Sequence, residues 1–112
     1  MTDEITMKYY QHLAQRTSGA GGDGERRLII AALGLAGEAG EFANMVKKLT
    51  AHGHDISLYA LSNELGDVMW YVAEAASAAG LDLGEIAEQN VDKLRKRYPE
   101  GFSEERSINR ED

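Results

Sequence analysis

The chain has 112 residues, of which 43% are hydrophobic and 28% are charged, a composition typical of a single soluble globular domain. It contains no cysteine, which excludes disulfides, thiolate metal sites and thiol nucleophiles. The net charge of −7 argues against a surface that coats DNA or RNA. The N-terminus lacks the apolar region of a signal peptide, and no apolar run approaches the roughly 18 residues of a membrane span. We therefore expect a cytoplasmic protein that has neither a nucleic-acid polymer nor a membrane as its partner.

Helical periodicity dominates the chain, and glycine-containing breaks separate its segments. The four predicted helices span about 3–16, 25–50, 56–79 and 82–97. Thr2 is the predicted N-cap of the first helix, and Asp82 with Glu85 forms a capping box at the start of the fourth. No segment alternates apolar and polar residues as a half-buried strand does, so we predict an all-α fold.

The helices are expected to form one domain over 1–102, followed by a polar, flexible tail over 103–112. The second and third helices, joined by a short turn, should pack as an antiparallel hairpin. Apolar residues cover most of the circumference of the third helix, which indicates burial from several sides. A chain of this length offers few neighbours for such a helix. We therefore expect a helical bundle that is completed by oligomerisation.

Two pairs of acidic residues interrupt otherwise apolar helix faces. Glu38 lies inside the apolar arc of the second helix, with Glu41 at its edge, and Glu64 and Asp67 interrupt the third helix. Each pair has i, i+3 spacing, which projects two carboxylates from adjacent turns. Either pair alone would also suit a solvated helix face. An unpaired buried carboxylate is costly, however, and the antiparallel hairpin could bring all four together.

Four carboxylates in one place repel one another and raise one another's pKa, and a bound cation removes that penalty. Hard oxygen ligands without cysteine or histidine favour Mg²⁺, or Mn²⁺ as a substitute, over zinc or copper. The sequence therefore predicts a divalent-metal site between the second and third helices.

Glu38-Ala39-Gly40-Glu41, followed after 22 residues by Glu64-Leu65-Gly66-Asp67, resembles the E-x-x-E…E-x-x-D signature of the MazG-like nucleotide pyrophosphohydrolases. These proteins belong to the all-α NTP pyrophosphatase superfamily. The segment 90–99, Asn-Val-Asp-Lys-Leu-Arg-Lys-Arg-Tyr-Pro, resembles the closing N-x-x-K-x-x-x-R-Y-P element of that family. The resemblance extends over about 25–102.

The resemblance implies an antiparallel four-helix bundle of the MazG type, assembled as a dimer or tetramer. It implies hydrolysis of a nucleoside triphosphate to the monophosphate and pyrophosphate with Mg²⁺. It implies metal ligands at four acidic positions, Glu38, Glu41, Glu64 and Asp67. It further suggests substrate contacts at four positions, Tyr71, Asn90, Lys93 and Arg97.

The chemistry of these groups suits the roles that the resemblance implies. Lys93 and Arg97, one turn apart, can neutralise the charge that develops on the leaving pyrophosphate. A carboxylate that the metal does not fully engage can accept the proton of the attacking water, and we favour Glu41 for this role. The enzyme would then sanitise or balance the nucleotide pool.

Several questions stay open at this point. Asn63 stands where several relatives carry a further acid, which leaves the number of metal ions open. The preferred base and sugar, the phosphorus attacked, the size of the oligomer and any sharing of the site between subunits are equally open. The alternative function is a non-catalytic helical module that binds a nucleotide or a protein.

Overall fold

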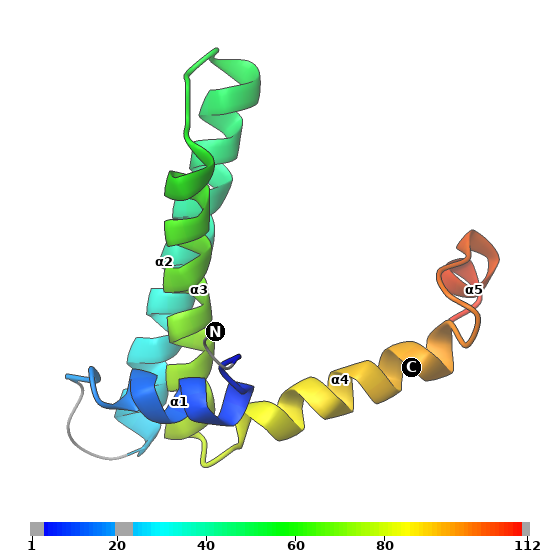
Figure 1. Cartoon of the computed structure of the whole chain (residues 1–112), viewed down its shortest axis with the longest axis horizontal. Helices are drawn as coiled ribbons and strands as arrows, with labels where there is room; N and C mark the ends of the chain where they lie inside the picture. Colours follow the sequence, from blue (N-terminus) through cyan, green and yellow to red (C-terminus); the bar gives the residue numbers. More distant parts are fainter. Residues whose placement is uncertain (1–3, 20–23, 111–112) are drawn as a thin grey trace.

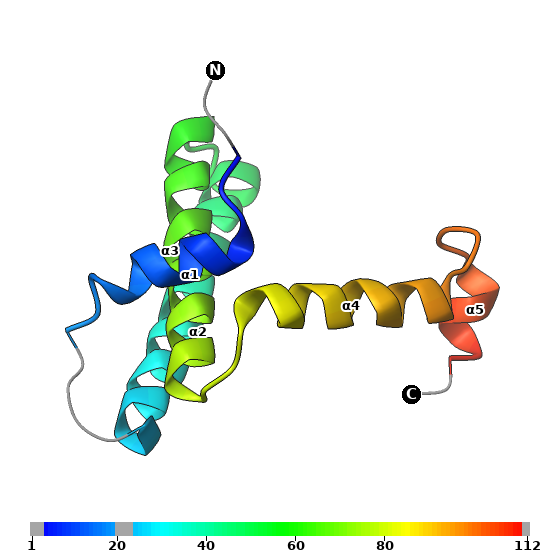
Figure 2. The same cartoon turned by 60° about the horizontal axis from the view of Figure 1, so that its bottom comes forward.

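The computed structural model describes residues 4–19 and 24–110, and within these ranges the regular secondary structure is entirely helical. Figures 1 and 2 show the helices, which are α1 (Met7–Gln15), α2 (Gly24–Ala51), α3 (Leu58–Ala78), α4 (Leu83–Arg97) and α5 (Glu104–Ile108). The two described ranges contain no strand, and Pro99 and Gly101 form an isolated bridge. The predicted all-α class is confirmed.

The long helices α2 and α3 form the predicted antiparallel hairpin and run side by side in both views (Figures 1 and 2). Ser57 caps α3, and its side chain accepts a hydrogen bond from the backbone N–H of Ala60 at 3.0 Å. Asp82 caps α4 in the same way, accepting from the backbone N–H of Glu85 at 3.1 Å, as the sequence predicts. These caps fix where the second half of the hairpin and the following helix begin.

Two terminal predictions differ from the structure. The first helix begins at Met7 and not near residue 3, because Thr6 has extended backbone angles and its Oγ1 accepts from the N–H of Tyr9 at 3.0 Å. Thr2, the predicted cap, lies outside the described residues. The segment expected to be a flexible tail contains α5, a short helix capped by Ser103.

Helix α1 crosses α3 and is tied to it through Gln11, a buried amide. The Gln11 Nε2 group donates to the carbonyl of Leu81 at 2.9 Å and to Oγ of Ser77 at 3.1 Å. Its Oε1 accepts from the backbone N–H of Leu83 at 2.8 Å. One satisfied side chain therefore joins α1, the end of α3 and the first residue of α4, and it helps to set the direction in which α4 leaves.

A buried ion pair fixes the start of α2 against α3. Glu74 is only 4% exposed and accepts from Arg27, at 3.1 Å to its Nε, and from the hydroxyl of Ser18. Burial alone would raise the pKa of Glu74, but the hydrogen bonds from Arg27 and Ser18 and the charge of Arg27 lower it below its usual range. Removing one partner from such a pair typically costs about 3–5 kcal/mol. The pair therefore holds the hairpin together at the end remote from its turn.

Helix α4 leaves the other helices. Figures 1 and 2 show it leading away from the α2–α3 hairpin, with α5 at its far end. Leu83 at its start is buried, whereas all residues over 88–96 are exposed. Within one chain, α1, α2 and α3 pack together and α4 does not lie along them. Completion of the bundle by a second copy stays a prediction.

The hydrophobic core of one chain is thin. Its buried hydrophobic residues in the described ranges are mostly alanines, namely Ala14, Ala31, Ala73, Ala76 and Leu83. Large apolar side chains are instead exposed along the hairpin, including Leu33 at 70% and Leu58 at 82%. The sequence predicts a third helix that is apolar on most sides. In a single chain, part of that apolar surface is expected to stay exposed.

Helix α2 is more apolar than the sequence analysis allowed. Its 28 residues include an 18-residue stretch with a mean hydropathy of 1.3, so by length and composition alone it could cross a membrane. The core helix of a soluble protein meets the same criteria. Here α2 packs along α3 and carries the half-buried Glu38 and the exposed Glu41, so the finding is weak support for a membrane span.

Candidate metal centre

Three of the four singled-out carboxylates meet between α2 and α3. Glu38 projects from α2, and Glu64 and Asp67 project from adjacent turns of α3. One carboxylate oxygen of each lies within 4.8 Å of the others. Glu38 and Glu64 are half-buried and Asp67 is exposed, so the cluster opens to solvent on one side. We call these three residues the acidic cluster.

Glu41 lies one turn beyond Glu38 on α2 and is exposed. The charge of Glu41 contributes to the raised pKa of Glu64, so Glu41 lies in the same electrostatic environment. It is not one of the three residues of the acidic cluster. The structure therefore places Glu41 at the rim of the acidic cluster.

The charges of the cluster are poorly compensated. The pKa of Glu64 is raised to about 7, first by a hydrogen bond with the Glu38 side chain, then by burial, and then by the charges of Glu38, Asp67 and Glu41. No lysine or arginine is among these causes. Oε1 of Glu64 is enclosed and has no hydrogen-bond partner among the residues that the structure describes. Enclosed polar atoms normally have a partner.

These observations fit a divalent cation. An enclosed carboxylate oxygen without a donor, beside two further carboxylates, is an arrangement that a hard cation would satisfy. The donor set is all oxygen, which suits Mg²⁺ or Mn²⁺ and not a soft metal. Clusters of exposed acidic groups also occur without a metal. The enclosed Oε1 of Glu64 is therefore more specific evidence for a cation than the clustering of the carboxylates.

Two tyrosines border the acidic cluster. Tyr71 lies one turn beyond Asp67, and its ring covers Gly34 of α2 so closely that a Cβ atom there would be 2.1 Å from the ring. Tyr10 of α1 is half-buried, and burial and the charge of Asp67 raise its pKa. Tyr71 is among the residues predicted from the sequence, whereas Tyr10 is not, because the approach of α1 to Asp67 is a long-range contact that no local pattern signals.

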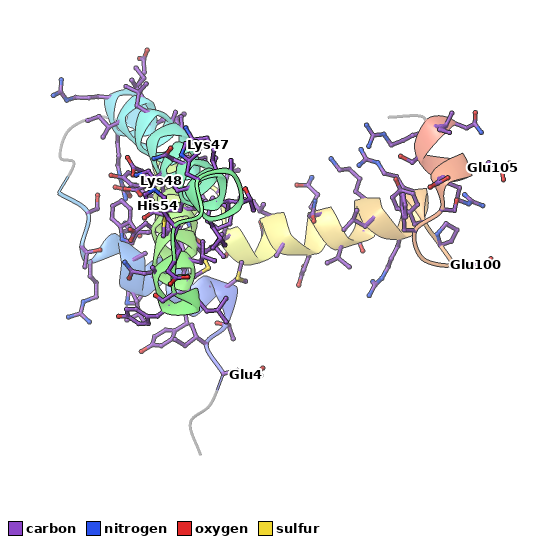
Figure 3. All side chains as sticks on the ribbon, turned by 90° about the horizontal axis from the view of Figure 1, so that it is seen from above. Glu4, Lys47, Lys48, His54, Glu100 and Glu105 are labelled. Carbon is purple, nitrogen blue, oxygen red and sulfur yellow. The ribbon has the colours of Figure 1, made fainter. Side chains whose placement is uncertain are left out.

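The remaining singled-out residues lie on α4. Asn90 and Lys93 are exposed on the part of α4 that leads away from the hairpin, so one chain does not bring them to the acidic cluster. Figure 3, seen from above, shows the same separation: Lys47, Lys48 and His54 lie on the hairpin, and Glu100 and Glu105 lie at the far end of the molecule.

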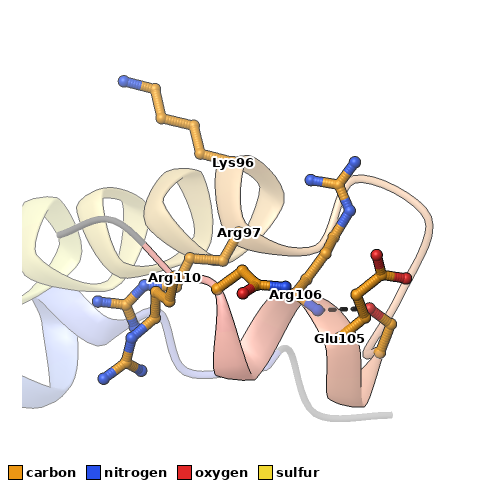
Figure 4. A pocket seen from close by; sticks show the side chains of 7 residues that line it. Lys96, Arg97, Glu105, Arg106 and Arg110 are labelled. Carbon is orange, nitrogen blue, oxygen red and sulfur yellow. Dashed lines mark hydrogen bonds between the residues drawn. The ribbon is translucent and has the colours of Figure 1, made fainter.

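Arg97 belongs to a basic hollow of about 510 Å³ where α4 meets α5. Lys96, Arg97, Arg106 and Arg110 contribute its positive groups, and Glu105 is the acidic residue in its lining. Figure 4 shows these side chains around the junction of the two helices. The structure thus separates an acidic region on the hairpin from a basic region at the end of α4.

Comparison with known proteins agrees with this arrangement of motifs. The model of the MazG nucleotide pyrophosphohydrolase domain matches residues 29–102, which include both acidic pairs and the segment 90–99. "Gene 37 protein" of Mycobacterium phage L5 is 38% identical over 109 residues, covering 90% of this chain and 96% of that protein. No solved structure gives a significant match. The chain belongs to the MazG nucleotide pyrophosphohydrolase family.

Proposed function

We propose that this protein is a Mg²⁺-dependent nucleoside triphosphate pyrophosphohydrolase, an enzyme that converts an NTP or dNTP and water to the monophosphate and pyrophosphate. Its role would be to sanitise or balance the nucleotide pool of the cytoplasm. The observation that carries the proposal is the acidic cluster with the enclosed, unpartnered Oε1 of Glu64, in a chain of the MazG family.

Glu38, Glu64 and Asp67 would hold the metal, with Glu41 as a further ligand at the rim. When bound, Mg²⁺ orients the phosphates, polarises their oxygens and lowers the pKa of water. Glu41 is the most exposed of the acidic residues on α2 that face this site, and it would accept the proton of the attacking water. Tyr71, held against Gly34, would contact the substrate from the side of α3.

Positive groups are needed at the phosphates because the substrate and the acidic cluster repel each other. Lys93 and Arg97 would contact the phosphates and neutralise the leaving pyrophosphate, and Asn90 would donate a hydrogen bond to the substrate. These residues lie away from the acidic cluster of their own chain. The proposal therefore includes a homo-oligomer, a dimer or a tetramer.

A second candidate is a helical module that binds a nucleotide or a protein without cleaving it. It is favoured by one observation: within one chain, Asn90 and Lys93 lie exposed on the part of α4 that leads away from the acidic cluster. Such a cluster could bind a metal and stabilise the hairpin without chemistry.

Product analysis separates the two candidates. The purified protein is incubated with a panel of canonical and modified NTPs and dNTPs, with Mg²⁺ or Mn²⁺, and the products are separated by ion-exchange chromatography. We expect monophosphate and pyrophosphate, and no products when EDTA is added. Diphosphate and phosphate would overturn the cleavage site. No turnover of any nucleotide would favour the binding module, and calorimetry would then measure nucleotide binding.

A further inference from the structure

The basic hollow at the junction of α4 and α5 is lined by seven residues, and the proposed function gives a role only to Arg97 among them. Five of the seven lie beyond residue 102, where the match to the MazG family model ends. We propose that the basic hollow is a second binding site, separate from the acidic cluster, whose ligand is a small polyphosphate anion: inorganic pyrophosphate or the phosphate chain of a nucleotide. The inference does not rest on the proposed function, because binding here needs neither a metal nor hydrolysis.

The first argument is the local frame that forms the hollow. After α4 the chain reverses direction at Gly101, whose φ of +91° is unstrained for glycine and whose N–H donates to the carbonyl of Tyr98 at 3.1 Å. The rings of Tyr98 and Phe102 pack edge to face, with their centroids 5.3 Å apart. Ser103 then caps α5, because its Oγ accepts from the backbone N–H of Arg106 at 3.1 Å. These contacts hold α5 beside the end of α4, so the hollow is formed without a ligand.

The second argument is charge. Four of the 12 lysines and arginines of the chain line the hollow, against one of its 19 acidic residues, which gives a local net charge of +3 in a chain of −7. Lys96 and Arg97 by themselves suit the C-terminal end of α4, where bases are favoured. The return of the chain then brings Arg106 and Arg110 to the same place, although like charges repel. A hollow lined by one sign of charge attracts ions of the opposite sign.

The third argument is how the basic groups are distributed. Lys96 and Arg106 form no ion pair with any residue that the structure describes. In Figure 4, Arg97 and Arg110 extend to one side of the junction, and Lys96 and Arg106 extend to another. An anion that contacts groups on both sides must carry charge at more than one point. A di- or triphosphate meets this requirement, whereas a single phosphate group reaches only part of the lining.

The fourth argument is the chemistry of the lining. Arginine presents a planar fork of N–H donors that matches two oxygens of one phosphate group. The hydroxyl of Ser103 and the side-chain amide of Asn109 add neutral donors to the same hollow. Its volume of about 510 Å³ lies within the range of small-ligand sites, about 300–1,000 Å³. Only Arg97 and Ser103 of the lining are half-buried and the rest is exposed, which suits a hydrated anion and not an apolar ligand.

Isothermal titration calorimetry of the whole protein with inorganic pyrophosphate, in EDTA and at low salt, tests this site. EDTA removes divalent cations, and the metal-free acidic cluster repels the anion, so the binding measured belongs to basic groups. We expect one pyrophosphate per chain, bound more weakly as salt is added. The double variant Arg106→Gln/Arg110→Gln should lower the affinity by at least about tenfold, because each substitution removes a charge-assisted hydrogen bond.

Two further variants control for charge and for folding. Lys47→Gln/Lys48→Gln removes the same charge from exposed positions near the end of α2 and should keep the wild-type affinity. Arg106→Lys/Arg110→Lys keeps the charge of the hollow but loses the guanidinium forks, so its affinity should lie between those of the wild-type protein and the glutamine variant. No binding by the wild-type protein, an unchanged affinity in the glutamine variant, or an equal loss in the Lys47/Lys48 control would overturn the inference.

Titrations with a nucleoside diphosphate and with sulfate under the same conditions identify the source of the anion. Equal affinities for pyrophosphate and the nucleotide support a site for phosphates alone, and tighter binding of the nucleotide supports a site that also contacts the nucleoside. Sulfate bound as tightly as pyrophosphate would overturn the inference, because the hollow would then attract any anion. A protein that binds pyrophosphate in EDTA but hydrolyses no nucleotide would overturn the proposed function alone, so the two failures are distinguishable.

Discussion

At the scale of single residues, Glu64 shows how strongly the carboxylates of the acidic cluster repel one another. Its carboxyl group lies against Glu38 and near Asp67 and Glu41, and this environment raises its pKa to about 7. A metal reverses the preference, because a ligating carboxylate must be ionised. Under the proposed function, the features that make the metal-free protein less stable at neutral pH would therefore be those that prepare it to bind a cation.

This electrostatic environment predicts how stability depends on pH without metal. The folded pKa of Glu64 is about 7 against an ordinary value of 4.5, so the native state binds this proton more tightly than the unfolded state. Its stabilising contribution is complete below the ordinary value and is lost as pH rises to about 7. In EDTA, we expect the melting temperature to fall more steeply over this range for the wild-type protein than for Glu64→Gln.

Glu88→Gln, which changes an exposed carboxylate of α4, is the control and should keep the wild-type pH profile. Adding Mg²⁺ at pH 7.5 should raise the melting temperature of the wild-type protein more than that of Glu64→Gln. If Glu64→Gln kept the full wild-type dependence on pH, the acidic cluster would not be its source.

At the scale of elements, the contact between α2 and α3 depends on a glycine. The ring of Tyr71 occupies the space that a side chain at Gly34 would need. This contact sets the distance between the helices one turn from Asp67. The backbone of α2 at Gly34 thus helps to determine how Tyr71 borders the acidic cluster.

Two alanine substitutions in α2 should have opposite effects. Gly34→Ala places a Cβ atom 2.1 Å from the Tyr71 ring, and such overpacking typically costs about 1–3 kcal/mol. Gly37→Ala meets nothing within 4 Å and gains up to about 1 kcal/mol of helix propensity. Urea unfolding measures both free energies. Equal effects of the two substitutions would contradict the role of Gly34.

The elements themselves were largely predictable, because their signals are local. The N-cap residue Asp82 specifies where α4 starts, and the glycine-containing segments between the helices specify where the helices stop. The start of α1 was wrong because Thr2 and Thr6 offer the same capping chemistry, and the backbone at Thr6 decides between them. The Arg27–Glu74 pair was missed because it joins residues far apart in the sequence.

At the scale of the whole molecule, the approach of Glu38 to Glu64 and Asp67 was predictable from their spacing and from the hairpin. The direction of α4 was not. Amphipathic periodicity identifies α4 as a helix with an apolar stripe, but it does not specify which surface covers that stripe. The hydrogen bonds of Gln11 to Leu81 and Leu83, which orient the start of α4, have no signature in the sequence.

The acidic and the basic residues singled out from the sequence lie in different parts of the molecule. The acidic cluster lies on α2 and α3, whereas Asn90 and Lys93 lie on the part of α4 that leads away from the hairpin, so one chain does not bring them together. A second copy that covered the exposed apolar surface of this thin-cored chain would stabilise it, which stays a prediction.

The most direct test of the account is the effect of Asp67→Asn on the rate of pyrophosphate release from the best substrate at saturating Mg²⁺. Replacing a residue that supports a metal ligand costs 10–100-fold, so loss of a ligand itself should lower the rate by at least about 100-fold. Asp55→Asn, an exposed aspartate outside the cluster, should keep the wild-type rate. Circular dichroism confirms that both variants fold. A wild-type rate for Asp67→Asn would contradict the assignment of the acidic cluster as the metal centre.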